Sequence, residues 1–223
     1  MRTIALEEHY ATPAFMEGPG RQLKEQAEAA RAHPRVAAGY AKLIEGLCDL
    51  GEGRVAAMDA AGIDVQVLSL TSPGVEQLDA GEAVTLAREA NDALAEAVRS
   101  RPDRLVGFAA LPTAAPEAAA DELERVVRHG FVGALVNGHS RGRYLDDGFF
   151  WPMLERAEAL GVPIYLHHRP RGRWWRRPTP GTSRRGSREG WRRRRGAGMW
   201  RRPPMCCASS WVACSTGSRV CGS

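Results

Sequence analysis

The chain has 223 residues and a formal net charge of +5, which averages two unlike parts. From position 169 to the end there are fifteen Arg against one acid, a charge of +14, so the residues before it must carry −9. The body, residues 1–168, is therefore acidic and gives no support for the nucleic-acid partner that the overall basic balance would indicate.

The body is long enough for one domain with a hydrophobic core. It contains one cysteine, Cys48, which excludes a disulfide framework and fits a reducing cytoplasm. The first residues turn acidic within seven positions, and no apolar run approaches the ~20 residues of a membrane span. We therefore expect a cytoplasmic protein without a secretory signal or a membrane anchor.

Apolar runs and helical spacings alternate along the body. The first strand is expected at 3–6 and ends in a polar loop that carries Glu7 and His9. Two helices follow, with Pro34 and Gly39 as weak interruptions, and then a third that ends at Gly62. In chain order, the helices are expected at 22–31, 36–47, 51–61, 81–101, 116–129 and 149–160, and the later strands at 64–70, 105–111, 132–136 and 163–166.

Five strands that alternate with helices are typical of βα units around a parallel sheet. A doubly wound sheet and a (β/α)8 barrel both fit this pattern. No GxGxxG follows the first strand, which disfavours a dinucleotide site. The first strand leads into an acid and a histidine, and the fifth into His167, as expected for the carboxyl-end active site of a barrel. We therefore predict an α/β fold of the TIM-barrel type, with about the first five βα units present.

Glu7, His9 and His167 are the candidate metal ligands. Side chains two apart on an extended segment point the same way, so Glu7 and His9 can reach one point. A carboxylate with two imidazoles suits Zn²⁺ or Mn²⁺. The alternative is that Glu7 and Glu8 are solvated and that His9 bonds a neighbouring loop.

Four other residues receive simpler interpretations. The helical spacing of Cys48 with Leu43 and Leu47 predicts a core position. His33 and His129 lie near helix ends, where we expect solvated side chains. His139 follows the fourth strand, in a loop on the expected active-site face, where it either touches a substrate or is inert.

Five stretches together resemble the amidohydrolase-related decarboxylases that act on dihydroxybenzoates. They occur in family order along the whole body. The stretches are Ile4-Ala-Leu-Glu-Glu-His-Tyr10, Arg54-Val-Ala-Ala-Met-Asp-Ala-Ala-Gly-Ile63, Ser69-Leu-Thr-Ser-Pro-Gly74, Gly133-Ala-Leu-Val-Asn-Gly138 and Pro163-Ile-Tyr-Leu-His167.

The resemblance implies a metal-dependent (β/α)8 barrel of the amidohydrolase type. In that family the Glu and His of the first strand, a His after strand 5 and an Asp after strand 8 hold the metal, and a further His after strand 5 serves the reaction. Glu7, His9 and His167 match the first three ligands. No residue of this sequence matches the later His or the Asp, so no catalytic residue is assigned.

The implied reaction is the non-oxidative decarboxylation of a small aromatic acid by a homo-oligomeric carboxy-lyase. A divalent metal, Zn or Mn, holds the substrate in register, and a group with a near-neutral pKa protonates the ring carbon. A metal-dependent hydrolase of the same superfamily is the alternative. The alternative of another class is a basic protein that binds nucleic acid through residues 169–223.

Residues 169–223 hold five of the six Trp and four of the five Cys, and they contain no Leu, Ile, Phe or Tyr. Such a segment cannot bury an aliphatic core, and we expect it to be disordered. One interpretation is an arm that binds nucleic acid through Arg and Trp side chains and is centred on 192–195. A cysteine metal site is another, but its spacing matches no common zinc pattern. The four cysteines are Cys206, Cys207, Cys214 and Cys221.

The third interpretation is out-of-frame translation after His167. Back-translation of 205–222 with permitted synonymous codons, read one base earlier, yields HVLRVILGGVFDRFPGLR. That string has helical aliphatic spacing and resembles the family stretch after strand 5. One lost C would convert CAC-CCA-CCG into CAC-CAC-CG, which gives His168 and Arg169 where the family has His-Pro-Pro or similar. The sequence therefore predicts a barrel that is interrupted just after its third metal ligand.

Overall fold

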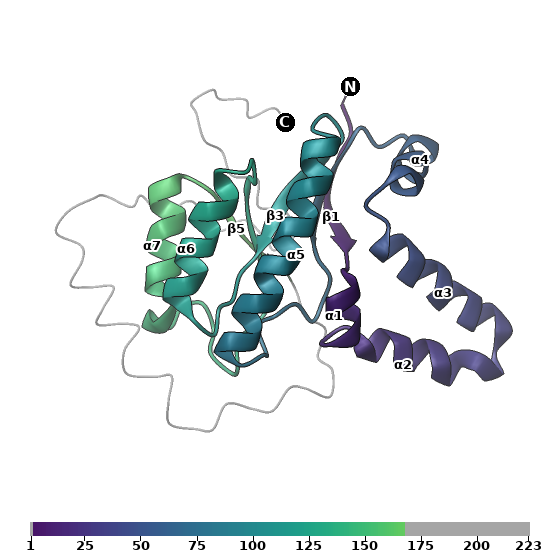
Figure 1. Cartoon of the computed structure of the whole chain (residues 1–223), viewed down its shortest axis with the longest axis horizontal. Helices are drawn as coiled ribbons and strands as arrows, with labels where there is room; N and C mark the ends of the chain where they lie inside the picture. The colour runs from purple at the N-terminus through teal and green to yellow at the C-terminus, as the bar shows by residue number, and fades with distance from the viewer. Residues whose placement is uncertain (1, 168–223) are drawn as a thin grey trace, which may run out of the picture.

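The computed structural model describes residues 2–167, so the predictions for 169–223 lie outside the described residues. Within this range five parallel strands lie in the order β1-β2-β3-β4-β5. A doubly wound sheet reverses its strand order at a switch point, and this sheet does not. The fold is the five-stranded part of a TIM barrel, as predicted (Figure 1).

Helices connect the strands on one side of the sheet. The strands are β1 (Ile4–Tyr10), β2 (Val65–Leu70), β3 (Leu105–Ala110), β4 (Gly133–Asn137) and β5 (Ile164–His167). The helices are α1 (Pro13–Glu17), α2 (Arg21–Ala29), α3 (Pro34–Cys48), α4 (Glu52–Ala61), α5 (Ala80–Ser100), α6 (Pro116–Val127) and α7 (Trp151–Leu160), with short 3-10 turns at Ala30–Ala32 and Gly148–Phe150. Within residues 2–167 no helix is both long and apolar enough to cross a bilayer.

Local sequence explains where most helices begin and end. Proline lies in the first turn of α3, α6 and α7, where its missing N–H is not needed. Pro34 therefore starts α3 and separates it from the preceding helix, in agreement with the predicted interruption there, whereas Gly39 lies inside α3 and does not interrupt it. Gly62 and Gly161 end α4 and α7 in the left-handed conformation, with φ of 68° and 67°.

The first strand differs most from the prediction. It does not stop at residue 6 but continues to Tyr10, so Glu7 and His9 lie on the strand itself. Tyr10 is fully buried, and its hydroxyl donates to the carbonyl of Ala90 on α5 at 2.9 Å. Burial raises the pKa of the Tyr10 phenol. This anchor extends the strand past the polar residues that were expected to end it.

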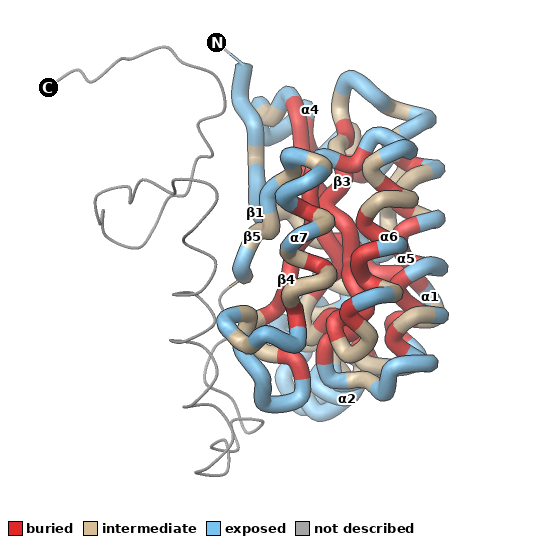
Figure 2. The backbone as a smooth tube through the Cα atoms, turned by 90° about the vertical axis from the view of Figure 1, so that its left-hand side faces the viewer, coloured by how far each residue is buried: buried red, intermediate tan, exposed pale blue. Residues whose placement is uncertain are grey.

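Two apolar layers lie on opposite faces of the sheet. The larger core packs the sheet against α5, α6 and α7, which cover one face in Figure 2. The smaller cluster consists of Val67, Phe108 and Leu135, with Val106 and Tyr165 packed against it. The rings of Phe108 and Tyr165 stack with centroids 5.8 Å apart. The second cluster is the interior of the partial barrel.

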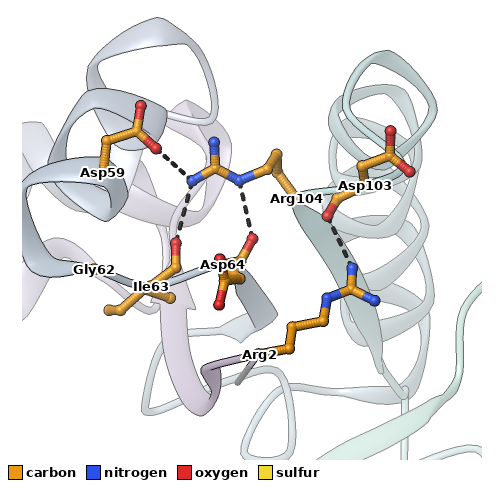
Figure 3. A pocket seen from close by; sticks show the side chains of 7 residues that line it. All are labelled: Arg2, Asp59, Gly62, Ile63, Asp64, Asp103 and Arg104. Carbon is orange, nitrogen blue, oxygen red and sulfur yellow. Dashed lines mark hydrogen bonds and ion pairs between the residues drawn. The ribbon is translucent and has the colours of Figure 1, made fainter.

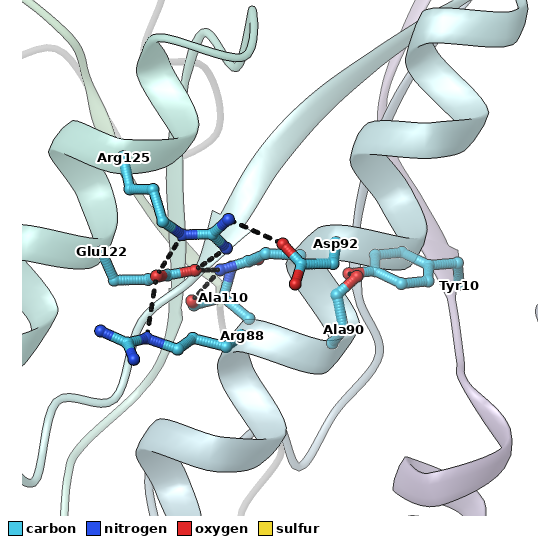
Figure 4. Close-up of polar contacts among 8 residues, drawn as sticks. Tyr10, Arg88, Ala90, Asp92, Ala110, Glu122 and Arg125 are labelled. Atoms are coloured by element: carbon cyan, nitrogen blue, oxygen red, sulfur yellow. Dashed lines mark hydrogen bonds and ion pairs between the residues drawn. The ribbon is translucent and has the colours of Figure 1, made fainter.

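A buried polar network ties α5 to β3 and α6 (Figure 4). Asn91 is fully buried, and its Nδ2 donates to the Ala110 carbonyl at 2.9 Å and to Glu122 Oε1 at 2.7 Å. The Ala110 N–H donates back to Asn91 Oδ1 at 2.8 Å. Arg125 donates to both Glu122 oxygens, which keeps this buried carboxylate paired. The side-chain amide of Asn91 therefore provides a hydrogen-bond partner for both the N–H and the carbonyl of Ala110, the last residue of β3.

Replacing Asn91 with Leu is expected to lower the free energy of unfolding by about 2–4 kcal/mol, because it removes the hydrogen bonds of the Asn91 side chain to the buried N–H and carbonyl of Ala110 and one of the hydrogen bonds to Glu122, which Arg125 still pairs. Urea denaturation of the full chain measures the change. Arg99→Ala on the same helix is the control, since Arg99 pairs with Glu96 at the surface and such pairs contribute little. Equal stability of the two variants would contradict the role given to Asn91.

Candidate metal centre

The predicted ligands lie at the carboxyl ends of the two outermost strands of the described sheet. Glu7 and His9 lie on β1, and His167 is the last residue of β5. The pairing of β1 with β2 shifts register between Ala5 and Glu8, which is a β-bulge. Bulges redirect side chains and are frequent near active sites. Here the bulge contains Glu7.

His9 and His167 face each other across the inside of the curved sheet. Their ring centroids are 5.1 Å apart in an edge-to-face arrangement. His9 Nδ1 lies 3.0 Å from Ser69 Oγ on β2, and that hydroxyl donates to the Glu8 carbonyl at 3.3 Å. With its proton directed there, Ser69 is arranged to accept from Nδ1–H, which leaves the Nε2 lone pair of His9 for another ligand.

Glu7 reaches the same face as the two imidazoles. Its Oε1 accepts a 2.7 Å hydrogen bond from the Tyr165 hydroxyl. Tyr165 lies two residues before His167 on β5, so both side chains project from one face of that strand. Hydrogen bonding to Glu7 and burial raise the pKa of Tyr165 to about 12. The expectation that Glu7 and His9 point the same way therefore agrees with the structure.

The electrostatics around His9 favour a neutral imidazole. Burial lowers the pKa of His9, and proximity to His167 lowers it further, although Ser69, Glu7 and Glu8 oppose the shift. Neutral imidazole is the form that binds metals. His9 is therefore in the protonation state that a ligand needs at neutral pH.

Buried polar atoms without a hydrogen-bond partner in the described chain gather at this edge of the sheet. Such atoms are costly, and in native proteins they mark functional sites or unseen ligands. They are Thr113 Oγ1 after β3, Asn137 Oδ1 at the end of β4 and His167 Nδ1 at the end of β5.

The donor set fits a divalent transition metal in chemistry: two imidazoles and a carboxylate on one face of the sheet, with a buried imidazole nitrogen lacking a partner. Among residues 2–167, no three His, Cys, Asp or Glu side chains come close enough together to hold a metal ion as they stand. Glu7 bonds Tyr165 in this arrangement. The later His and the Asp of the family pattern have no match in this sequence.

A hydrogen-bonded clamp fixes the loop after β4 against the loop after β2. Glu76 is buried, and its Oε1 accepts from the Asn137 N–H at 2.6 Å and from Asn137 Nδ2 at 3.2 Å. Ser140 Oγ donates to the Glu76 carbonyl at 3.0 Å, and Gln77 donates to the His139 carbonyl at 2.5 Å. Asn137 is the register partner of His167, so the clamp borders the candidate site.

Of the remaining single-residue predictions, the structure contradicts the one for Cys48 and agrees with those for His33 and His129. Cys48 is exposed, so its predicted core position was wrong. It ends α3, which extends away from the sheet together with α2 (Figure 1), and on α3 only Leu47 is buried. His33 and His129 are exposed as predicted. His139 is half-buried, and its Nδ1 accepts from the Gly142 N–H at 3.1 Å.

Sequence reasoning missed four residues that support the site: Ser69, Tyr165, Glu76 and Arg54. Tyr165 had a usable signal, since it alternates with His167 on a predicted strand. Ser69 also lies in a stretch that was noticed for its resemblance. The partner of Ser69 is 60 positions away in sequence and that of Tyr165 is 158 positions away. Hydrophobic periodicity contains no information about pairs so far apart.

A hollow at the opposite, amino ends of the strands is lined by charged residues that bind one another (Figure 3). Arg104 donates to the carbonyls of Asp64 and Ile63 at 2.9 and 3.1 Å and pairs with Asp59 at 2.6 Å. Arg2 donates to the Asp103 carbonyl at 3.2 Å. In TIM barrels this end serves stability rather than chemistry, so the hollow is not a second active site.

A protein-family model described as amidohydrolase matches residues 44–182. The chain therefore belongs to the amidohydrolase family. It is 42% identical over 174 residues to a gamma-resorcylate decarboxylase of Polaromonas, which covers 74% of this chain and 50% of that protein. The chain spans about half the length of the curated relatives it matches.

Two solved structures share the fold. One is a 5-carboxyvanillate decarboxylase from Novosphingobium aromaticivorans, complexed with manganese and 4-hydroxy-3-methoxy-5-nitrobenzoic acid. It is 39% identical, with a TM-score of 0.67, over 74% of this chain and 50% of the other. The other is a dihydroxybenzoic acid decarboxylase from Polaromonas with bound manganese and the inhibitor 2-nitroresorcinol, 43% identical, with a TM-score of 0.64, over 76% and 50% of the two chains.

Proposed function

We propose that this chain is the amino-terminal part of a metal-dependent enzyme that removes CO₂ from a hydroxybenzoate-like aromatic acid. The observation that carries the proposal is the placement of Glu7, His9 and His167 on one face, at the carboxyl ends of β1 and β5. The decarboxylase relatives supply the reaction class. Gamma-resorcylate is the first substrate to test, since relatives are named for it.

Glu7, His9 and His167 would hold the metal, Mn²⁺ or Zn²⁺. When bound, the ion would supply a Lewis acid that holds the aromatic acid and stabilises developing negative charge. Ser69 orients His9, and Tyr165 keeps the Glu7 carboxylate on the side of the two imidazoles. The buried apolar cluster that includes Phe108 lines the inside of the same sheet.

Decarboxylation needs one proton on the ring carbon that bears the carboxylate. The bond from that carbon to the carboxylate then breaks, its electron pair returns to the ring, and CO₂ leaves. The donor must have a pKa near the working pH. The family resemblance gives this role to a later His that has no match here, so we expect this chain to have little or no turnover.

We propose that the sequence after His167 is out of frame, which would account for the missing His and Asp. Two arguments support this: the abrupt change to an Arg-rich composition without Leu, Ile, Phe or Tyr, and a single shifted frame that yields a family-like helix. For the parent enzyme we propose a homo-oligomer in the cytoplasm. The −9 charge of the body disfavours nucleic acid as its partner.

The full chain is expected to bind Mn²⁺ weakly and reversibly at one site, because three donors are present and the fourth is missing. Electron paramagnetic resonance of free Mn²⁺ during a titration measures the binding, and a CO₂ assay with gamma-resorcylate measures turnover. His33→Ala is the control, since His33 is exposed and distant in sequence from the ligands. Binding no stronger than that of His9→Ala would contradict the metal centre.

A further inference from the structure

Arg54, on α4, is a buried cation behind the sheet, with 8% of its surface exposed. Its Nε donates to the Asp49 carbonyl at 2.6 Å, and its Nη1 donates to Gln66 Oε1 at 3.1 Å. Its Nη2 donates to the carbonyls of His9 at 2.9 Å and Gly46 at 2.8 Å. Four of the five guanidinium N–H groups are therefore used.

The four acceptors come from separate parts of the chain. Gly46 and Asp49 are at the end of α3, Gln66 is on β2, and His9 is on β1. Burial lowers the pKa of the Arg54 guanidinium, and the carboxylates of Glu8 and Asp49 oppose the shift. The guanidinium stays charged, so its placement costs desolvation that these bonds must offset.

The contact with His9 lies just past an irregularity in β1. The pairing with β2 shifts register between Ala5 and Glu8, and regular pairing resumes at Glu8 and continues through His9. A strand segment beside a bulge can twist, and a twist there changes the direction of the following side chains. Arg54 holds the His9 carbonyl from the helix side of the sheet, while the His9 ring points to the interior near His167.

We propose that Arg54 is a positioning residue for the candidate metal centre, which fixes the bulged end of β1 so that Glu7 and His9 point toward His167. The proposal also gives a reason for the arginine that opens the Arg54–Ile63 stretch noticed in the sequence. The proposal rests on the proposed function only in treating His9 as a metal ligand. The effect of Arg54 on β1 can be measured without metal.

The test compares Arg54→Lys with Arg104→Lys in the full chain. Both keep a positive charge, but lysine has a compact ammonium that cannot reach four separated acceptors. Arg104 is a matched control because it also bonds two backbone carbonyls, those of Asp64 and Ile63, at the amino end of β2. The two variants therefore loosen opposite ends of the same strand pair.

Amide hydrogen exchange by NMR reports on each end. The Thr71 N–H donates to the Tyr10 carbonyl at the carboxyl end, and the Val65 N–H donates to the Thr3 carbonyl at the amino end. Arg54→Lys is expected to speed exchange at Thr71 by at least about tenfold and to leave Val65 unchanged. Arg104→Lys is expected to do the reverse. Equal effects at both ends, or none at Thr71, would overturn the proposal.

The imidazole of His9 provides a second readout that general destabilisation does not move in the same way. In Arg54→Lys we expect the His9 ring nitrogens to lose the signature of the Ser69 hydrogen bond, while Arg104→Lys retains it. We also expect Mn²⁺ affinity to fall by about 10–100-fold in Arg54→Lys alone, as for other residues that orient ligands. Unchanged His9 signals in that variant would refute the assignment.

A milder variant keeps the test decisive if Arg54→Lys does not fold. Gln66→Met removes one acceptor of Arg54 and leaves its contact with His9 in place, so exchange at Thr71 should rise by a smaller factor than the loss of all four Arg54 hydrogen bonds would give. No change at Thr71 in Gln66→Met would then count against the positioning role of Arg54. If the parent chain binds no Mn²⁺, the proposed function fails, while the exchange data still judge Arg54.

Discussion

Inserting one C after the His167 codon, with the gene read to its next in-frame stop, is expected to produce a chain that releases CO₂ from gamma-resorcylate. The rate should exceed that of the present chain by at least about 10²–10⁴-fold, the usual contribution of a general acid. The restored sequence would also supply the strands that close the interior now lined by Phe108 and Leu135. A coupled CO₂ assay with added Mn²⁺ measures the gain.

Inserting three C at the same point is the matched control, since it adds one residue and keeps the present frame. It should leave the chain inactive. An active control, or a restored chain that folds and binds Mn²⁺ but releases no CO₂, would contradict the frame hypothesis. Sequencing the gene across the C run gives an independent check, because an intact run in related strains that encodes the present frame is incompatible with a lost base.

Much of the fold follows from patterns that are local in sequence. All five strands were expected within a few residues of their observed positions, because each is an apolar run bounded by Gly, Pro or charged residues. The choice between a doubly wound sheet and a barrel was harder, since periodicity carries no strand order. The polar residues at the ends of β1 and β5 favoured the barrel, and the sequential parallel order confirms it.

The errors share a physical cause, which is contact between distant segments. The first strand was ended too early because Glu7 and Glu8 are poor strand residues, and nothing local shows that Tyr10 anchors on α5. Cys48 has helical spacing with Leu43 and Leu47, but spacing defines a face and not what covers it. Leu43 is 49% exposed, so most of that face has no cover within the described residues.

The candidate site shows the same division. Residue types and their place at strand ends selected Glu7, His9 and His167, and the structure places them on one face. The hydrogen bonds that orient these side chains could not be predicted from the sequence. Tyr165 meets Glu7 across 158 positions, and the Arg54 guanidinium reaches His9 through its backbone carbonyl, which has no sequence signature.

Removing any one of the candidate ligands is expected to weaken metal binding strongly in the frame-restored chain. Glu7→Gln, His9→Ala and His167→Ala should each weaken Mn²⁺ binding by more than the about 10–100-fold typical of residues that only orient ligands. Each should also reduce CO₂ release to the level of the metal-free protein, because substrate is then no longer held beside a Lewis acid. Titration with Mn²⁺ and the CO₂ assay, done on the same samples, measure both.

His129→Ala is the control for the loss of a histidine that is not a ligand. His129 is exposed just after α6, so this variant should bind Mn²⁺ as the frame-restored chain does. Tyr165→Phe separates a ligand from a group that orients one: it frees Glu7 from its hydrogen bond and should change Mn²⁺ affinity less than Glu7→Gln. If Glu7→Gln leaves affinity intact while both histidine variants lose it, the carboxylate is not a ligand. The bulge in β1 would then serve His9 alone, and the metal would need its oxygen donor from the carboxyl-terminal half of the barrel.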